Sequence, residues 1–274
     1  MIEFLASQFP MVFGLVVTGF FAGILAGLLG VGGGIVNVPV LFFLFQSAGV
    51  SPETAMLVAT ATSLATIVPT SISSIRSHHR TGNVDVALLK SWWGFILTGV
   101  LLGSWLVMVI DGVWLAVLFG FIAILSVLNM LFRPAKSALF QRLPGKFGQI
   151  VMGGSIGCFS SMVGIGGGTI TVPLLTFYNY PAHRAVGTAA AIGLIISLPG
   201  ALTMLLLAST PSDAPYSTYG LVNLIAFLFI IPLTVIFAPL GVSIATKLDT
   251  VKLKRVFAVV LLITGLRMLS QIIL

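Results

Sequence analysis

The chain has 274 residues, of which 58% are hydrophobic and only 7% are charged, and its mean hydropathy is +1.18. A water-soluble domain of this size needs more charged side chains on its surface, so the composition excludes a soluble globular protein and predicts one that lies in lipid. Because a membrane-spanning helix takes about 20 apolar residues, the chain has material for roughly eight to ten crossings or part-crossings and none for a separate soluble domain.

The charge of the chain fits membrane topology. Thirteen Lys and Arg stand against six Asp and Glu, a net charge of +7, and the basic residues gather in short loops, where positive charge marks the cytoplasmic side. Nucleic acid is therefore not expected as a partner. The N-terminus carries Glu3 in place of a basic signal-peptide region, so we expect it in the mature protein. Cys158 is the only cysteine, which leaves no intrachain disulfide.

Five apolar segments are expected in each half of the chain. The segment that follows each glycine cluster is too short to span comfortably, so we expect a half-helix or a re-entrant helix there. In the first half the segments run at about 11–30, 35–47, 53–75, 86–109 and 113–132, and in the second half at about 148–164, 168–178, 184–207, 220–246 and 251–273.

The two halves repeat each other. GLLGVGGGIVNVPVLF at 27–42 and SMVGIGGGTITVPLLT at 161–176 align without gaps. Downstream, residues 55–71 align with 185–201. We therefore predict a duplication. Its parts are a first transmembrane repeat at 1–133, a basic cytoplasmic linker at 134–147 and a second transmembrane repeat at 148–274.

Basic residues fall in loops that are not equivalent in the two halves. By the positive-inside rule, the loops at 76–85, 133–147 and 247–255 are cytoplasmic. Both termini are then extracytoplasmic, and the two repeats cross the membrane in opposite orientations. The predicted fold class is an all-α polytopic membrane protein, with two inverted-topology repeats of about five helical segments each and broken or re-entrant helices at the glycine motifs. Such repeats are typical of secondary transporters, which bind substrate near the midplane where the repeats meet.

The glycine motifs do not fit a dinucleotide-binding loop, because Ile35 and Thr169 stand where the third glycine belongs. In lipid, backbone groups freed by a helix break are tolerated only where protein or a water-filled cavity satisfies them. A helix that begins at three glycines presents unpaired N–H groups at its positive dipole end, and the missing side chains let a ligand approach. We therefore predict an anion between two helix N-termini. Other glycines at four-residue spacing, such as Gly19, Gly23 and Gly27, are assigned to helix packing.

The predicted substrate-binding residues are these backbone donors, the polar side chains beside them and one arginine expected to attract the anion. They are Gly32, Gly33, Gly34, Asn37, Thr62, Ser63, Gly166, Gly167, Gly168, Thr169, Thr171, Arg184 and Thr188. Helix breaks or kinks are predicted at Pro39, Pro69, Pro173 and Pro199. No metal, cofactor or catalytic residue is predicted.

Charged residues and histidines are expected outside the membrane core. All six carboxylates lie at segment ends or in loops, which argues against a carboxylate-driven proton pump or cation carrier. Arg267 is expected to snorkel. His78 and His79 are assigned to a solvated cytoplasmic loop, and an enzyme is not expected because no histidine lies at membrane depth to serve as a base.

The duplicated pattern G-x-G-G-G-x-x-x-V-P, with A-V-G-T-A at 185–189, resembles the TauE/SafE family, also called the sulfite exporter family. The resemblance covers nearly the whole chain. It implies a bacterial-type inner-membrane secondary transporter that exports sulfur oxyanions or organosulfur anions, such as sulfite or a sulfonate. The first copy departs from the second at Leu57, where the second has Gly187.

The sequence thus predicts an exporter of a small sulfur-containing anion that works by alternating access. A passive anion channel and a non-transporting membrane scaffold stay open as alternatives. The partners expected are the anion and the lipid bilayer, and a homo-oligomer is left open. Coupling is also open, since a proton could travel with a protonatable anion or the membrane potential could drive export.

Overall fold

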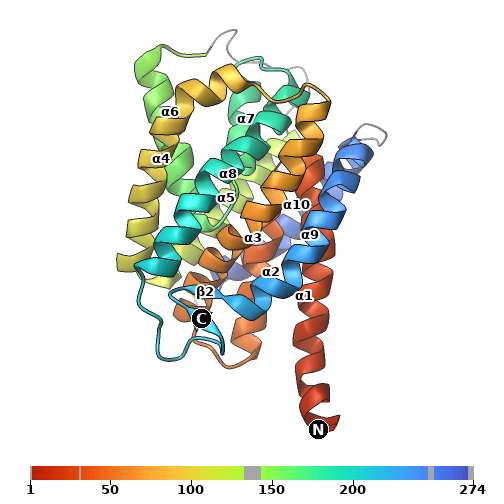
Figure 1. Ribbon diagram of the computed structural model, residues 1–274, viewed down its shortest axis with the longest axis vertical. Coiled ribbons are helices and arrows are strands. Elements are labelled where there is room, and N and C mark those ends of the chain that lie inside the picture. The colour runs from red at the N-terminus through yellow and green to blue at the C-terminus, as the bar shows by residue number, and fades with distance from the viewer. Residues whose placement is uncertain (1, 31, 133–142, 246–249, 271–274) are drawn as a thin grey trace.

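A computed structural model describes residues 2–30, 32–132, 143–245 and 250–270. Ten helices and one short β-hairpin form a single bundle whose helices run along its long axis (Figure 1). In chain order these elements are α1 (Ile2–Leu29), α2 (Gly34–Ser47), α3 (Pro52–Arg80), α4 (Val86–Val109), α5 (Gly112–Phe132), α6 (Lys146–Val163), α7 (Gly168–Phe177), α8 (Ala182–Leu206), β1 (Thr218–Tyr219), β2 (Val222–Asn223), α9 (Leu224–Ala245) and α10 (Thr250–Ser270).

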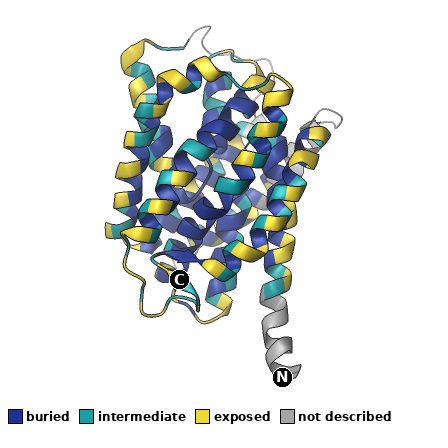
Figure 2. Cartoon of the chain, viewed as in Figure 1, coloured by how far each residue is buried: buried dark blue, intermediate teal, exposed yellow. Residues whose placement is uncertain are grey.

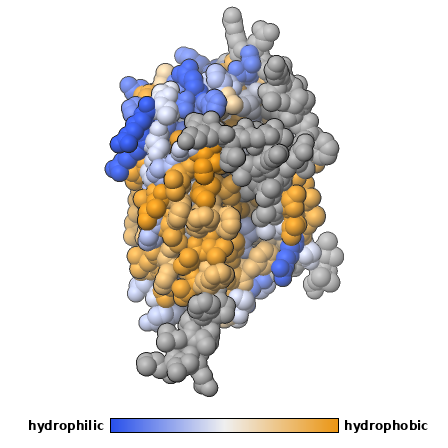
Figure 3. All heavy atoms as spheres, turned by 90° about the vertical axis from the view of Figure 1, so that its right-hand side faces the viewer, coloured by the Kyte–Doolittle hydropathy of each residue, from blue (hydrophilic) through white to orange (hydrophobic). Residues whose placement is uncertain are grey.

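The helices fit a polytopic membrane protein. Six of them, within the described residues, are long and apolar enough to cross a membrane: α1, α3, α4, α5, α8 and α9. Figure 3 shows hydrophobic side chains over the middle of one face and mostly hydrophilic ones toward its two ends. In contrast, α2 has 14 residues and α7 has 10, so at a rise of 1.5 Å per residue they are only about 21 and 15 Å long. As predicted, these two are part-crossings by length.

The ten predicted segments are all helical, but three of them have different bounds. The first helix begins at Ile2, well before residue 11. The third continues to Arg80. Its predicted end was too early because the last residues, SHHR, are polar and so do not appear as part of an apolar segment. The ninth begins only at Leu224, since residues 218–223 pair as an antiparallel hairpin.

Helices from the two halves pack on one another reciprocally. The first helix of each half lies against the fourth helix of the other, α1 against α9 and α6 against α4. At the centre α3 packs on α8, and α5 packs on α10. The most enclosed of the membrane-spanning helices is α3, in which 78% of the most apolar stretch is buried. Figure 2 shows the buried residues concentrated inside the bundle. The central pair α3 and α8 therefore lies at the core of the bundle.

Small residues make the peripheral contacts close, as predicted. A Cβ added to Gly27 would lie 1.9 Å from the carbonyl oxygen of Ala238 on α9. Likewise, a Cβ on Gly157 would lie 2.2 Å from the carbonyl oxygen of Ile96 on α4. These helices touch backbone to backbone, the packing that small residues permit in membranes.

Candidate substrate site

The helix breaks lie at the glycines. Between α1 and α2 the backbone is left-handed at Gly30, Gly32 and Gly33, with φ of +66°, +71° and +81°. Between α6 and α7 it is left-handed at Gly164 and Gly167, with φ of +71° and +52°. Only glycine adopts this conformation at little cost, which explains why each break needs a glycine cluster. We call residues 30–33 the first glycine loop and residues 164–167 the second.

The two glycine loops lie side by side in the interior. A Cβ on Gly34 would lie 2.5 Å from the carbonyl oxygen of Gly164. A Cβ on Gly32 would lie 3.6 Å from the Cα atom of Gly166. The side chain of Ile67 on α3 lies against the first loop and that of Ile196 on α8 against the second. Segments 134 positions apart in the sequence thus meet between the two central helices.

The short helices α2 and α7 begin at this meeting point. Their N-cap residues, Gly33 and Gly167, have no side chain that could accept from the first-turn N–H groups. Those groups lack acceptors within a helix, and they lie at the positive end of the helix dipole. Gly34 and Gly168 are buried. At the second loop, however, the N–H groups of Gly167 and Gly168 already donate to the carbonyl oxygens of Ile165 and Gly166.

Polar side chains connect the second glycine loop to α3 and α2. The Ser63 hydroxyl donates to the carbonyl oxygen of Gly164 at 2.7 Å. The Asn37 amide donates to the Thr66 hydroxyl at 2.8 Å, and Thr66 donates to the carbonyl oxygen of Ser63 at 2.7 Å. These bonds connect the second loop to α3 and α3 to α2.

Several buried polar atoms around the loops have no hydrogen-bond partner within the described chain. They include Asn37 Oδ1 and the hydroxyls of Thr60, Ser71, Thr169, Thr171 and Ser197. Leaving such an atom unpaired in the interior costs about 1–3 kcal/mol. Sequence reasoning missed Ser71 and Ser197. The signal for Ser71 was the recurrence of Ser and Thr along the segment that became α3.

Two predicted threonines lie at the heads of other helices. The Thr62 hydroxyl accepts from the backbone N–H of Asn223 at 2.9 Å, just before α9 begins. The Thr188 hydroxyl accepts from the backbone N–H of Asp85 at 2.9 Å, just before α4 begins. Each therefore ties a central helix of one half to the fourth helix of the other, and neither hydroxyl is unpaired.

Arg184 lies at one end of the bundle rather than between the glycine loops. Its guanidinium pairs with Asp85 at 3.0 Å, and its side chain is 49% exposed. The Tyr180 hydroxyl donates a short hydrogen bond to the same carboxylate. That bond is the main reason why the pKa of Asp85 is below its usual value. Burial, followed by the bond to Asp85, raises the pKa of Tyr180 to about 12.

The four predicted helix-breaking prolines do not break helices. Pro39 lies inside α2, Pro69 inside α3, Pro173 inside α7 and Pro199 inside α8. The predicted helix breaks at these prolines are therefore wrong, because a transmembrane helix tolerates the lost N–H where neighbouring groups satisfy the freed carbonyl. The kinks that were predicted as the alternative stay a prediction. The breaks occur at the left-handed glycines instead.

The assignment of His78 to a solvated loop is also wrong. The histidine lies in the last turns of α3, where it is only 4% exposed. Its Nε2 atom is 3.2 Å from the carbonyl oxygen of Gly27 on α1. His79, the next residue, is exposed. Near the other end of the chain, the guanidinium of Arg267 lies over the ring of Phe43, 4.8 Å from its centroid.

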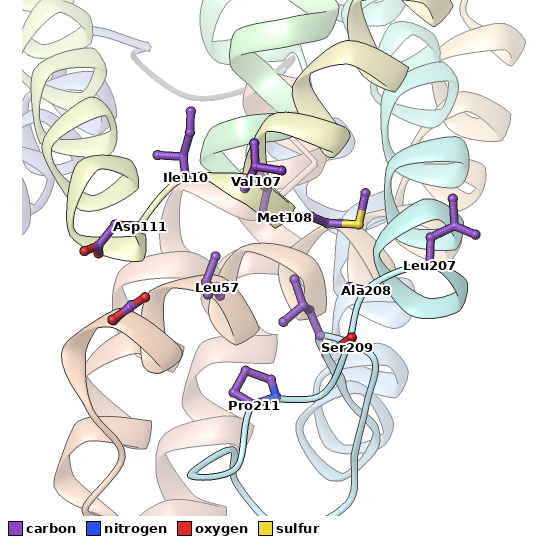
Figure 4. A pocket seen from close by; sticks show the side chains of 12 residues that line it. Leu57, Val107, Met108, Ile110, Asp111, Leu207, Ala208, Ser209 and Pro211 are labelled. Atoms are coloured by element: carbon purple, nitrogen blue, oxygen red, sulfur yellow. The ribbon is translucent and has the colours of Figure 1, made fainter.

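A cleft of about 520 Å³ opens where α3 begins and α4 and α8 end. Figure 4 shows it between the labelled side chains of Leu57, Val107, Asp111 and Pro211. At the head of α3, Asp213 accepts from the Thr54 hydroxyl at 2.6 Å. Hydrogen bonds from Ser51 and Thr54 lower the pKa of Asp213 to about 2. The cleft is lined by none of the predicted substrate-binding residues.

The sequence is similar to that of a known family of membrane proteins and to several of its members. The model of the family described as sulfite exporter TauE/SafE matches residues 15–268. A probable membrane transporter protein of Haemophilus influenzae is 30% identical over 250 residues, which cover 91% of this chain and 95% of that protein. Another from Methanocaldococcus jannaschii is 30% identical over 267 residues, with 93% and 94% covered. The probable membrane transporter protein YunE of Bacillus subtilis is 26% identical, with 94% and 97% covered. No solved structure matches the chain.

Proposed function

Because the chain belongs to the sulfite exporter TauE/SafE family, we propose that it is a secondary transporter that exports a small sulfur-containing anion, such as sulfite or an organosulfonate. The family and the relatives are transporters, which favours transport over an enzymatic activity. The membrane is the inner membrane in this proposal.

The observation that carries the proposal is the meeting of the two glycine loops. The two short helices begin at adjoining glycine loops without side-chain caps. Buried polar atoms of Asn37, Thr169 and Thr171 are unpaired within the described residues. A sulfite or sulfonate group carries its charge on several oxygens, so it can accept from both helix ends and from the hydroxyls at once.

The proposed topology is a pair of inverted repeats, residues 1–133 and 148–274, joined by the linker 134–147. Two features support it. The contacts between the halves are reciprocal, with α1 on α9 and α6 on α4. In Figure 1, α1 runs from the end marked N toward the opposite end, and α6 runs the other way. The positive-inside rule then puts the end of α3 and the start of α6 in the cytoplasm.

The two ends of the bundle differ in a way that fits alternating access. At the proposed cytoplasmic end, Asp85 on the first half is tied to Arg184 and Tyr180 on the second. At the opposite end the cleft reaches Leu57, near Thr60, whose Cα atom packs on the second glycine loop. This asymmetry supports a carrier that is closed to the cytoplasm, whereas the second candidate, a passive channel, would offer one continuous path.

The test is flux of labelled sulfite and sulfoacetate into proteoliposomes. Gly167→Leu replaces a left-handed glycine against Ile196, while Gly49→Leu makes the same strain where nothing lies within 4 Å. We expect saturable flux that is lost in Gly167→Leu and kept in Gly49→Leu. Flux without saturation or trans-stimulation would favour the channel. Normal flux in Gly167→Leu would overturn the proposed site, and no flux of any sulfur anion by the wild type would overturn the proposed substrate class.

A further inference from the structure

A buried polar stripe runs along one face of α3. Its members are spaced by three or four residues, which places them on one side of a helix. They are Ser63, Thr66, Thr70, Ser74 and His78, each with less than 5% of its surface exposed. From the first to the last the helix rises about 22 Å, so the stripe extends over much of one leaflet and ends near the proposed cytoplasmic surface.

The stripe is continuous with the proposed substrate site. Ser63 bonds the second glycine loop, and Thr66 bonds Asn37 of α2. One turn further on, the Thr70 hydroxyl lies 2.8 Å from that of Thr234 on α9. The Ser74 hydroxyl is buried and has no partner among the described residues. Polar groups therefore succeed one another from the glycine loops toward His78.

His78 has one bonded and one unbonded ring nitrogen. A carbonyl oxygen only accepts, so the contact with Gly27 requires that Nε2 carries a hydrogen. The other nitrogen, Nδ1, is buried without a partner in the described part of the chain. In this tautomer Nδ1 is a free acceptor for one proton. Gly27 belongs to the last turn of α1, directly before the first glycine loop, and the negative end of a helix dipole favours a protonated imidazole.

Few charged groups surround this histidine. The packed helices α1 and α9 carry no titratable side chain in their described parts near it, since Glu3 lies at the far end of α1. On α8, His183 is exposed, and Arg184 beside it is paired with Asp85. On α3 itself, Arg76, His79 and Arg80 are exposed. Among the described residues, no carboxylate bonds the imidazole.

We propose that His78 takes up and releases the proton whose movement is coupled to that of the anion. This inference rests on the proposed function and deepens it by naming the coupling ion and its carrier. A proton binds at Nδ1, the imidazolium offsets the charge of an anion on the polar stripe, and the same proton leaves when the anion leaves. Imidazole suits this role because its ordinary pKa lies in the physiological range. Proton coupling then needs no carboxylate in the membrane core.

The test compares His78→Gln with His79→Gln. Glutamine keeps an N–H that can donate to Gly27 but takes up no proton in this pH range, and residue 79 is the exposed neighbour. The probe is labelled sulfoacetate, whose sulfonate group is that of a strong acid and stays ionised at every pH of the test. We expect wild type and His79→Gln to accumulate it in response to a pH gradient. His78→Gln is expected to lose this accumulation and the pH dependence of flux while it still exchanges internal for external anion.

Each outcome has a distinct meaning. Gradient-driven accumulation in His78→Gln would overturn the inference and leave the proposed function intact. His78→Gln could also be inactive in anion exchange. In that case, calorimetry of anion binding to the wild type, in buffers of different ionisation enthalpy, measures whether a proton is taken up with the anion. Proton uptake when the anion binds to the wild type, but not to purified His78→Gln, would support the inference. No proton uptake by the wild type would overturn the inference. No sulfoacetate transport or binding by the wild type would overturn the proposed function first.

Discussion

Arg184 and Asp85 form an ion pair between the two halves of the chain, with the guanidinium 3.0 Å from the carboxylate. Asp85 also caps α4 by accepting from the N–H of Leu88 at 3.0 Å. The arginine that the sequence assigned to attracting the anion therefore has a carboxylate partner. We infer that the pair holds the proposed cytoplasmic end closed.

Asp85→Asn and Arg184→Gln are expected to have similar effects on transport, because both remove the same ion pair. Such partly exposed pairs contribute about 0.2–1 kcal/mol, so each change should alter the maximal rate by a small factor, and the double variant should equal either single one. Initial rates over a range of anion concentrations check this. A raised KM in Arg184→Gln alone would instead support direct attraction of the anion.

Tyr180→Phe should make the protein more sensitive to acid. The Asp85 pKa is lowered in the folded protein, so its contribution to stability is present above its usual pKa and is lost as the pH falls through the folded value. Removing the Tyr180 bond moves that loss to higher pH. Melting temperatures from acid to neutral pH, with Tyr178→Phe as the control, measure the shift. Identical acid profiles of the two variants would contradict the assignment.

Gly34→Ala should abolish transport without preventing insertion. Gly34 is helical, so the change adds no backbone strain, but the new Cβ would lie 2.5 Å from the carbonyl oxygen of Gly164. The control is Gly94→Ala on α4, where nothing lies within 4 Å. Flux per inserted molecule compares them. Equal flux would show that close contact of the two glycine loops is not needed.

Thr171→Val should weaken anion binding and stabilise the empty protein. The Thr171 hydroxyl is buried and unpaired in the described structure, so its removal relieves a cost of about 1–3 kcal/mol. If the anion is its partner, affinity falls about tenfold or more, since a hydrogen bond to a charged group contributes about 1.5–3 kcal/mol. Thr66→Val is the control for stability. Because the Thr66 hydroxyl is bonded to Asn37, this substitution should destabilise the empty protein. Unchanged affinity in Thr171→Val would remove that hydroxyl from the site.

The sequence predicted much of this architecture, and the errors have physical reasons. Hydropathy and the repeat located the ten segments, and the glycine clusters marked the breaks because left-handed backbone needs glycine. It failed at His78, since a polar helix end that is buried by α1 looks the same in sequence as a solvated loop. It placed Arg184 without its partner because the Asp85 contact joins residues of different halves, which only the packing of α8 beside α4 brings together.

The proposed inversion makes equivalent residues of the two repeats face opposite sides of the membrane. Glu53 and His183 occupy equivalent positions at the starts of α3 and α8, and both are exposed. In a Cys158→Ser background, Glu53→Cys should react with an impermeant maleimide in intact cells, and His183→Cys only in inside-out vesicles. The positive-inside rule sets which residue faces outward, and inversion requires that they differ. Labelling of both cysteines from the same side would show that the repeats are parallel, and the anion could not then lie between two helix ends that approach from opposite faces.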